Sequence, residues 1–254
     1  MEPRPAGTAN NPFNMQRIIR AVNVGKAYKK SVLETIALKD VTLEVNEGEF
    51  ICVMGPSGCG KTTLLNLLGL LDVPDSGKIY LMGEDISGAS NHHRATIRRK
   101  DIGFVFQNFN LIEELTLYEN IELPLVYQRV SKKERKKAVT GLLEKMQLNH
   151  KRRAFPAELS GGQQQRGAIA RAMIGKPQIV FADEPTGNLD SIQGQEIMEM
   201  LLTLNNEGTT VIMATHSPDA TDYCSRVIKL FDGQIVTENI KQNLTTDTFS
   251  VSRQ

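Results

Sequence analysis

Residues 55–62 constrain the fold of this chain more strongly than any other stretch of its sequence. They read Gly-Pro-Ser-Gly-Cys-Gly-Lys-Thr and stand between a continuously apolar run at 50–54 and a helix-like run at 63–71. The glycines allow backbone N–H groups to turn inward around phosphate oxygens, and the N-terminus of the following helix adds a partial positive charge. This order of strand, glycine-rich loop and helix predicts an α/β fold that binds the phosphates of a nucleotide.

An ordinary glycine-rich turn before a helix is the alternative, but the strand, loop and helix stand in the register that phosphate binding requires. Contacts with the nucleotide are expected from Gly55, Ser57, Gly58, Cys59, Gly60, Lys61, Thr62 and Thr63. The Lys61 ammonium should reach the β- and γ-phosphates, and the Thr62 hydroxyl can ligate Mg²⁺. Because Cys59 stands at a helix N-terminus near Lys61, we expect its thiol to react with alkylating reagents unless ATP is bound.

Two further apolar runs, at 179–182 and 211–214, lead into polar residues that suit phosphate chemistry. Asp183 and Glu184 follow the first run. Neighbouring side chains of a strand point in opposite directions, so the two acids need not share a role. Asp183 is expected to hold Mg²⁺ through water, and Glu184 to orient or deprotonate the attacking water. His216 follows the second run and is expected to hydrogen-bond the γ-phosphate, because ligands bind at the carboxyl ends of such strands.

Each of these three residues also has a plain structural interpretation. Acids at strand ends often cap the turn that follows, and a lone histidine is more often structural than functional. The phosphate loop in the same chain favours the catalytic interpretation of all three.

The remaining apolar pattern predicts a parallel sheet covered by helices, beside a smaller antiparallel layer. Strands buried on both faces are typical of parallel sheets and read as continuous apolar runs, as at 50–54, 179–182 and 211–214. Shorter β-prone runs with turn signals between them indicate the antiparallel layer. These runs are 18–24, 41–45 and 78–82.

Helices are expected over two apolar stripes. One, at 139–146, follows a capping box that begins at Ser131, and the other, at 197–204, ends before Gly208. The dipeptide at 232–233 is Asp-Gly between two β-prone runs, which predicts a tight hairpin near the end of the chain.

Residues 159–163 read Leu-Ser-Gly-Gly-Gln and resemble the signature motif of ATP-binding cassette (ABC) proteins. Ser160 and Gln163 have capping-box spacing, while Gly161 and Gly162 permit close approach to the backbone. An ordinary capped helix is the alternative for these residues alone. The motifs occur in the family's order and cover about residues 17–236. The resemblance therefore implies a P-loop NTPase core of mainly parallel sheet, with an antiparallel β subdomain and a helical signature-motif subdomain at roughly 108–172.

The resemblance also implies roles for three residues outside these motifs. Tyr28 is similar to the aromatic residue that stacks on adenine, Gln107 to the glutamine that ligates Mg²⁺ and senses the γ-phosphate, and Asp190 to the acid that communicates across a dimer. By residue type alone, Tyr28 could be a core or edge aromatic, Gln107 a surface amide and Asp190 a helix cap. The family acts as a head-to-tail pair, so residues 160–163 of one copy are expected to close the ATP site of a second copy.

Within the family, residues 107–112, 119–125 and 185–190 are similar to the ATPases of macrolide exporters and lipoprotein-release systems. Those ATPases work with separate or fused membrane subunits, so a separate transmembrane permease is the expected partner. The apolar residues after Gln107 are expected to form part of the groove that receives a cytoplasmic helix of that partner. They are Phe109, Leu111, Ile112 and Leu115. The chain departs from the family at Gly167, which is expected to cost its helix up to about 1 kcal/mol and to reduce local rigidity.

Composition limits the other possibilities. The 254 residues carry 30 Lys plus Arg against 29 Asp plus Glu, a formal net charge of +1, so no strong overall field attracts nucleic acid or lipid. No run approaches the ~18 apolar residues of a membrane span. Three cysteines without paired spacing favour a reducing, cytoplasmic location, peripheral to the membrane through the permease. Residues 1–15 and 239–254 are polar and aperiodic, so they are expected to be flexible tails around an ATPase domain at 16–238.

These features together predict an ATPase that uses ATP and Mg²⁺ and drives a membrane permease, with Glu184, His216 and Lys61 as its catalytic residues. Two alternatives stay open: a regulatory ABC ATPase that signals through a membrane partner, and a soluble ABC ATPase that acts on nucleic acid or ribosomes. Basic runs at 94–100 and 129–137 suit the second alternative, although solvated helix faces explain them better in a near-neutral chain. No specific nucleic acid is therefore expected as a partner.

Overall fold

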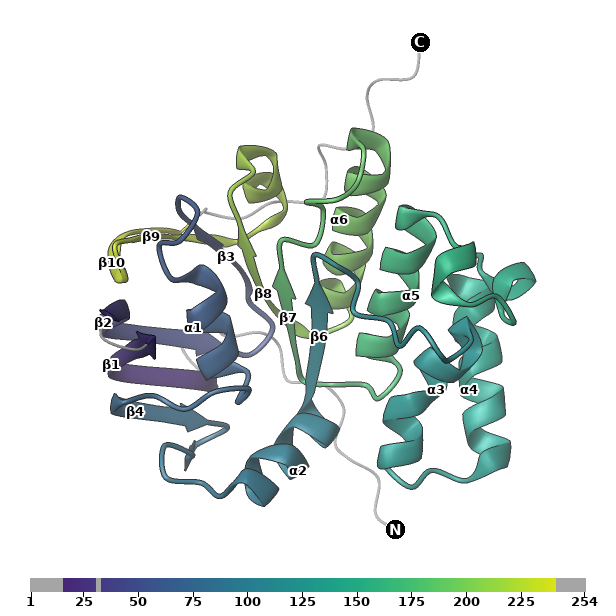
Figure 1. Cartoon of the computed structure of the whole chain (residues 1–254), viewed down its shortest axis with the longest axis horizontal. Helices are drawn as coiled ribbons and strands as arrows, with labels where there is room; N and C mark the ends of the chain where they lie inside the picture. Colours follow the sequence, from purple (N-terminus) through teal and green to yellow (C-terminus); the bar gives the residue numbers. More distant parts are fainter. Residues whose placement is uncertain (1–15, 31–32, 241–254) are drawn as a thin grey trace.

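The computed structural model describes residues 16–30 and 33–240, and its centre is a six-stranded sheet (Figure 1). The strands are β3 (Phe50–Met54), β6 (Ile102–Phe106), β7 (Ile179–Asp183), β8 (Thr210–Thr215), β9 (Arg226–Phe231) and β10 (Gln234–Ile240). Their order is β10-β9-β3-β8-β7-β6, and every neighbouring pair is parallel except the hairpin of β9 and β10. Parallel strands end at the same edge of a sheet, so the loops after β3, β6, β7 and β8 meet there.

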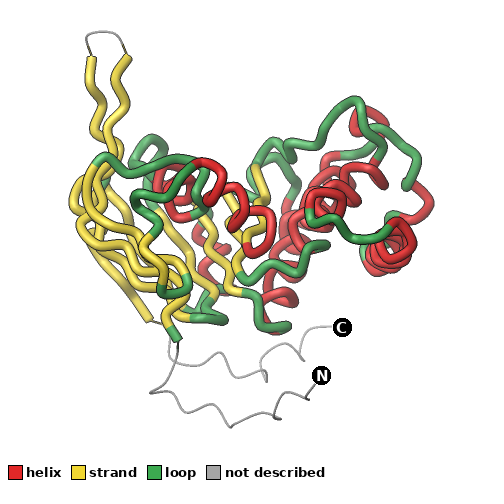
Figure 2. Tube along the Cα trace, turned by 90° about the horizontal axis from the view of Figure 1, so that it is seen from below, coloured by secondary structure: helices red, strands yellow, loops and turns green. Residues whose placement is uncertain are grey.

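A second sheet of four antiparallel strands packs beside the first. Its strands are β1 (Arg17–Lys30), β2 (Leu33–Asn46), β4 (Ser76–Leu81) and β5 (Glu84–Asp85), in the order β2-β1-β4-β5. β1 and β2 form a long hairpin that projects from the body of the molecule (Figure 2). This hairpin carries Tyr28, which pairs with Thr35 near its outer end.

The side chains of β3 divide the interior into two cores. Ile51 and Val53 lie in the core shared with α1 (Lys61–Leu68) and the antiparallel sheet, whereas Phe50 and Cys52 lie in the core shared with α5 (Gly161–Met173) and α6 (Ser191–Asn206). All four side chains are buried. Burial on both faces explains why the strands of this sheet read as continuous apolar runs.

A helical subdomain extends beyond the edge strand β6 (Figure 1). It holds α3 (Leu117–Tyr127), α4 (Lys132–Lys145), α5 and two 3₁₀ turns, η1 (Asn149–Lys151) and η2 (Pro156–Glu158). Helices α3 and α5 approach closely at Gly167, where a Cβ atom would lie 2.6 Å from Cδ1 of the buried Leu117. The glycine that was expected to loosen α5 therefore has a packing role.

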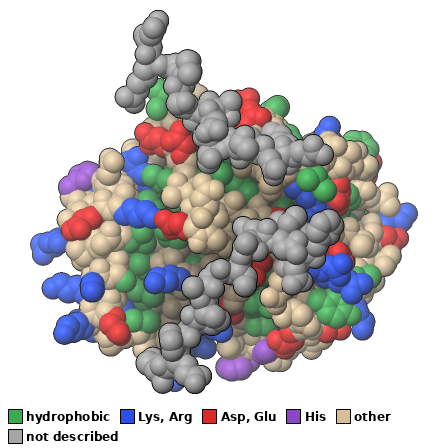
Figure 3. Space-filling model, turned by 180° about the vertical axis from the view of Figure 1, so that it is seen from behind, with side chains coloured by type: hydrophobic (Ala, Val, Ile, Leu, Met, Phe, Trp, Pro, Cys, Tyr) green, Lys and Arg blue, Asp and Glu red, His purple; other side chains and the backbone are tan. Residues whose placement is uncertain are grey.

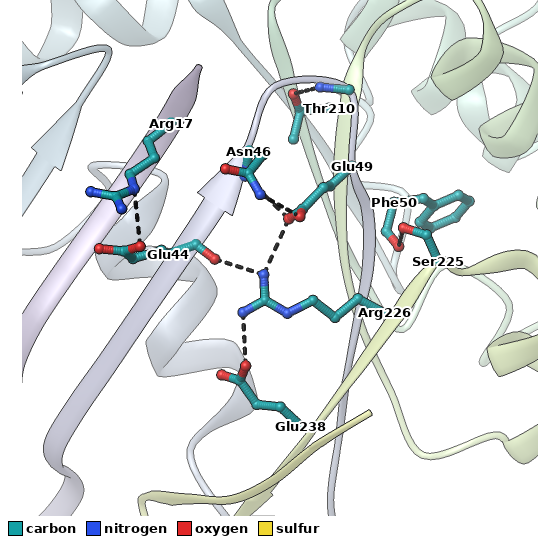
Figure 4. A network of polar contacts seen from close by, with 10 residues as sticks. Arg17, Glu44, Asn46, Glu49, Phe50, Thr210, Ser225, Arg226 and Glu238 are labelled. Atoms are coloured by element: carbon teal, nitrogen blue, oxygen red, sulfur yellow. Dashed lines mark hydrogen bonds and ion pairs between the residues drawn. The ribbon is translucent and has the colours of Figure 1, made fainter. Parts of the chain in front are cut away.

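A polar network at the amino-terminal end of β9 joins the two sheets (Figure 4). The Arg226 guanidinium donates to the Glu44 carbonyl oxygen at 2.8 Å, to Glu49 Oε2 at 3.2 Å and to Glu238 Oε2 at 2.9 Å. Glu49 also accepts from Asn46 Nδ2 at 2.8 Å. The side chains of Arg226 and Glu49 are only 12% and 16% exposed. The network lies at the edge opposite the carboxyl ends of the strands. Its role is therefore to hold the two sheets together.

The predicted parallel core, antiparallel layer, two helical stripes and hairpin at 232–233 are all present. The elements that were not predicted include β6 and the polar helix before it, α2 (Asn91–Asp101). The helix runs directly into the strand, so no turn residue separates them in the sequence. A short 3₁₀ turn, η3 (Pro218–Tyr223), precedes β9.

The structure describes little of the two predicted tails. Residues 1–15 and 241–254 lie outside the described residues, while residues 239 and 240 belong to β10. Within 16–30 and 33–240, none of the helices is both long enough and apolar enough to cross a membrane.

Candidate active site

The phosphate loop joins β3 to α1 at the carboxyl edge of the parallel sheet. Gly60 has a φ of 106° and precedes α1 without a side-chain cap, and no acidic residue occupies the first turn of the helix. The N–H groups of this turn are therefore not neutralised by a carboxylate, as an anion site requires. A Cβ atom on Gly60 would lie 2.4 Å from the Ala37 carbonyl oxygen, so the position requires glycine.

Lys61 begins α1, and its side chain folds back over the loop. Its ammonium donates to the carbonyl oxygens of Gly55 at 2.8 Å and Pro56 at 3.1 Å, and the side chain is only 8% exposed. Its Nζ lies 3.8 Å from Glu184 Oε1. The Lys61 ammonium thus lies at the centre of the loop, next to the carboxylate of the residue that follows β7.

Cys59 differs from the rest of the loop because its thiol points into the core. It is 5% exposed and belongs to the same apolar cluster as α1, whereas Ser57, Gly58 and Thr62 are exposed. Its sulfur fills the space beside Gly55, where a Cβ atom would lie 2.5 Å away. The structure argues against the expected ready alkylation of Cys59, because burial shields the thiol.

Asp183 ends β7 and faces the start of α1. Burial raises the pKa of its carboxyl above the ordinary value, with a smaller contribution from Glu184, while the Thr62 hydroxyl and Lys61 act to lower it. Its Oδ1 atom is buried and has no hydrogen-bond partner among the described residues. An orphaned carboxylate oxygen beside a hydroxyl is a donor set that suits a hard cation, so Asp183 and Thr62 fit Mg²⁺.

Glu184 adopts a left-handed backbone conformation with a φ of 48°, which is strained for a residue with a side chain. Its amide donates to the Ala214 carbonyl oxygen on β8 at 2.8 Å, which ties this conformation to the sheet. Its carboxylate accepts from Thr215 Oγ1 at 3.1 Å and lies 2.9 Å from His216 Nδ1. The structure therefore places the Lys61 ammonium and the His216 imidazole beside the Glu184 carboxylate. Strain of this kind concentrates at active sites.

Ser160 caps α5 as the sequence predicts. The Gln163 amide donates to Ser160 Oγ at 3.3 Å, and the Ser160 amide donates to Gln163 Oε1 at 3.0 Å. Gly161 and Gly162 form the first turn of α5, which contains no acidic residue. Helices α1 and α5 pack on opposite faces of the parallel sheet, so the two helix N-termini of one copy lie on different sides of it.

Tyr28 lies on the β1–β2 hairpin, 42% exposed, and its hydroxyl donates to Asp72 Oδ2 at 2.9 Å. The buried Lys26 donates to Asp72 Oδ1 at 3.1 Å and lies 5.4 Å from the centre of the Tyr28 ring. Burial acts to raise the pKa of Asp72, but hydrogen bonds from the Val73 amide, Tyr28 and Lys26 outweigh it, so the pKa is lowered. The charged Asp72 thus anchors Tyr28 by its hydroxyl, while the residue stays partly exposed.

Gln107 and Asp190 lie on the two loops that follow β6 and β7. Gln107 Nε2 donates to Asn188 Oδ1 at 3.2 Å, so its amide is bound to the other loop. Asp190 caps α6, because its Oδ1 accepts from the Gln193 amide at 2.8 Å. The helix-cap interpretation of Asp190 is therefore correct, and a role across a dimer would be additional.

Sequence reasoning missed three residues that contact the expected site residues: Asn188, Thr215 and Asp72. Asn188 stands inside the segment 185–190, and Thr215 directly precedes His216, so both had a signal in the sequence. Asp72 had none, because the Tyr28 hydroxyl that it binds comes from 44 residues earlier in the chain.

Known proteins match this chain over most of its length. The family described as ABC transporter matches residues 38–187, which include the phosphate loop, Gln107, the signature residues and Glu184. An uncharacterized ABC transporter ATP-binding protein of Methanocaldococcus jannaschii is 52% identical over 86% of this chain and 98% of its own length. The macrolide export ATP-binding/permease protein MacB of Brucella melitensis is 42% identical over 90% of this chain. The match covers only 35% of the length of MacB.

A solved structure agrees with these sequence matches. A dimeric ATP-binding cassette in a post-hydrolysis state, bound to ADP and Pi, is similar to this chain with a TM-score of 0.83 and 42% identity. The likeness covers 89% of this chain and 99% of that one. The chain therefore belongs to the family of ABC transporter ATP-binding proteins.

Proposed function

We propose that this chain hydrolyses ATP and thereby drives a membrane permease that is made as a separate chain. The observation that carries the proposal is the convergence of Lys61, Glu184 and His216 at the phosphate loop. An ammonium 3.8 Å from a carboxylate that is itself in hydrogen-bonding contact with an imidazole, beside a helix N-terminus, suits the transfer of a phosphoryl group to water.

In this proposal each residue has a separate task. The loop N–H groups and Lys61 bind the β- and γ-phosphates, and Tyr28 offers an aromatic surface to adenine. Glu184 orients the attacking water and accepts its proton. His216 contacts Glu184 through Nδ1, and an imidazolium at this position would also donate from Nε2 to the γ-phosphate.

Thr62, Asp183 and Gln107 are the residues that would hold Mg²⁺. The cation would neutralise charge on the phosphate oxygens. The unpartnered buried Oδ1 of Asp183 supports this assignment, since such an atom calls for a ligand.

We further propose that two copies pair head to tail around ATP. The capped N-terminus of α5, at residues 160–163, lies on the other side of the sheet from its own α1. In this proposal its N–H groups serve the nucleotide of a second copy. The dimeric state of the ADP- and Pi-bound relative supports this arrangement.

A hollow of about 740 Å³ beside β6 supports a contact with the permease. Its walls include the apolar side chains of Phe104, Phe106, Ile112 and Leu123. Its charged lining residues are all basic among those that the structure describes: Arg98, Arg99, Lys100 and Arg171. By charge complementarity, the occupant would be a cytoplasmic helix of the permease with an apolar face and acidic residues.

Fewer of the apolar residues after Gln107 line this hollow than the sequence suggests. Ile112 lines it, whereas Leu111 is buried in the core that β3 shares with α5 and α6. Phe109 packs against that same core. Ile112 is therefore the better position at which to test contact with the permease.

A nucleic-acid partner has less support. The basic residues of α4 are exposed at Lys132, Lys133, Lys136 and Lys137. On the face seen in Figure 3, Lys and Arg side chains are interspersed with acidic ones. Solvation of an exposed helix explains such a pattern, and the permease part of MacB favours a membrane partner for a related ATPase.

The test is reconstitution of the chain with its candidate permease in liposomes. We expect Mg²⁺-dependent ATP hydrolysis that the permease stimulates, and loss of nearly all of it in the matched Lys61→Ala variant. Cargo movement would identify a transporter, whereas stimulation without movement would favour the regulatory alternative. Stimulation by RNA or ribosomes and not by the permease would overturn the proposal.

A further inference from the structure

Building on the proposed role of Gln107 toward Mg²⁺ and the γ-phosphate, we infer that Asn188 is the residue that positions Gln107. Asn188 fixes which end of the Gln107 side-chain amide faces the nucleotide. It does so from the loop after β7, the same loop that begins at Glu184 and ends at Asp190.

Three hydrogen bonds tie Asn188 to the loop after β6. Asn188 Nδ2 donates to the Gln107 carbonyl oxygen at 3.0 Å and to Asn108 Oδ1 at 3.0 Å. Asn188 Oδ1 accepts from Gln107 Nε2 at 3.2 Å. Gln107 and Asn188 are 81 residues apart in the chain, so this is a specific link between two loops.

The chemistry of these partners fixes the orientation of both amides. A backbone carbonyl oxygen can only accept, so the Asn188 atom that faces the Gln107 carbonyl must be the donor Nδ2. The other end of the Asn188 amide is then Oδ1, which can only accept. It selects the donor Nε2 of Gln107, and the Gln107 Oε1 atom is turned away from Asn188.

This orientation matters because only the oxygen of an amide can ligate a hard cation. An unrestrained glutamine side chain rotates freely and presents its nitrogen as readily as its oxygen. The bond to Asn188 removes this ambiguity before the nucleotide arrives.

A glycine provides the space in which Gln107 lies. A Cβ atom on Gly187 would stand 2.8 Å from Gln107 Nε2 and 3.1 Å from its Cδ. The Gln107 side chain therefore lies directly against the backbone of the loop after β7. The loop after β6 also has a left-handed backbone, at Phe109 and Asn110, with φ values of 61° and 49°. Asn188 therefore holds the Gln107 side chain from a different loop than the one that carries Gln107.

The experiment measures cation binding rather than turnover. Mn²⁺ stands in for Mg²⁺, and its dissociation constant is measured by electron paramagnetic resonance with saturating ATP in the Glu184→Gln background. In that background we compare Asn188→Ala, Gln107→Ala and the double variant. For Asn188→Ala, ATP affinity without a divalent cation and the melting temperature serve as controls, which we expect to stay unchanged.

We expect Asn188→Ala to weaken Mn²⁺ binding about three- to tenfold, the factor that corresponds to one hydrogen bond of ordinary strength. Gln107→Ala should weaken it at least as much. The double variant should be no weaker than Gln107→Ala, because Asn188 then has nothing to position.

Two results would overturn the inference while leaving the role of Gln107 intact. One is unchanged Mn²⁺ binding in Asn188→Ala beside weakened binding in Gln107→Ala. The other is an Asn188→Ala effect that persists in full when Gln107 is already absent. Unchanged Mn²⁺ binding in Gln107→Ala would instead overturn the proposed role of Gln107, and the inference with it.

Discussion

Asp183 stands at the end of β7 in surroundings that oppose its charge. Burial raises its pKa above the ordinary 3.8, so the folded chain binds this proton more tightly than the unfolded chain does. The stability that this group contributes is therefore greatest at low pH and falls as pH rises from the ordinary value through the raised one. At neutral pH the ionised carboxylate destabilises the nucleotide-free fold, a cost that binding sites commonly carry.

Asp183→Asn should raise the melting temperature of the nucleotide-free protein by a few degrees at pH 7, because it removes a buried charge and keeps the shape. The variant should lose most of the stabilisation that ATP with Mg²⁺ gives to the wild type. Scanning calorimetry at pH 7 and near pH 4 tests both points. The difference in melting temperature should shrink at the lower pH, where the wild-type carboxyl takes up its proton. A nucleotide-free variant that melts below the wild type at pH 7 would contradict this account.

Cys59 provides a second test at the scale of one side chain. Its thiol is 5% exposed, so a small alkylating reagent should label it only when the loop opens locally. We expect labelling at least about a hundredfold slower than in the urea-unfolded chain, as mass spectrometry can measure. Rapid labelling of the folded protein that ATP suppresses would instead restore the expectation drawn from the sequence.

At the scale of helices and strands, the sequence predicted what local pattern controls. Buried parallel strands read as apolar runs, and the capping box at Ser160 begins α5 where its spacing indicates. Contacts between distant segments were not predictable from one sequence. The packing role of Gly167 depends on Leu117, and the anchoring of Tyr28 depends on Asp72. The phosphate loop and the two acids at the end of β7 were therefore found, while the residues that hold them in place were not.

The loop between β6 and α3 depends on one buried side chain, Asn120. Its Oδ1 accepts from the Ile112 amide at 2.8 Å. Its Nδ2 lies 3.0 Å from the carbonyl oxygens of Ile112 and Leu115 and 3.1 Å from that of Thr116. The side chain is fully buried, so no water can replace these bonds without a change in packing.

Asn120→Ala should lower the free energy of unfolding by about 2–4 kcal/mol, because it removes the acceptor of the Ile112 amide and the side-chain donor to three carbonyl oxygens. Asn120→Asp should cost a similar amount, because a carboxylate accepts from Ile112 but cannot donate to the three carbonyl oxygens. Urea unfolding measures both changes. A loss under about 0.5 kcal/mol in both variants would mean that other contacts hold the loop.

At the scale of the whole molecule, the proposed head-to-tail pair would make each copy carry one half of two different sites. In this proposal the phosphate loop, Glu184 and His216 form one half, and residues 160–163, at the start of the helix on the other face of the sheet from α1, form the other. Head-to-tail pairing would join unlike halves and bury two nucleotides between the copies. The central claim is therefore that ATP closes a dimer through the N-terminus of α5.

The most direct test is the mass of the particle by size-exclusion chromatography with light scattering in Mg-ATP. Glu184→Gln keeps the shape of the side chain but removes its basicity, so ATP should bind without hydrolysis and hold the dimer closed. Adding Ser160→Arg places bulk and charge on the surface that meets the second nucleotide, so this double variant should remain a monomer. Ser131→Arg makes the same change at the cap of α4, and with Glu184→Gln it should still dimerise. A monomer for Glu184→Gln at high concentration, or equal dimerisation with Ser160→Arg, would contradict the account.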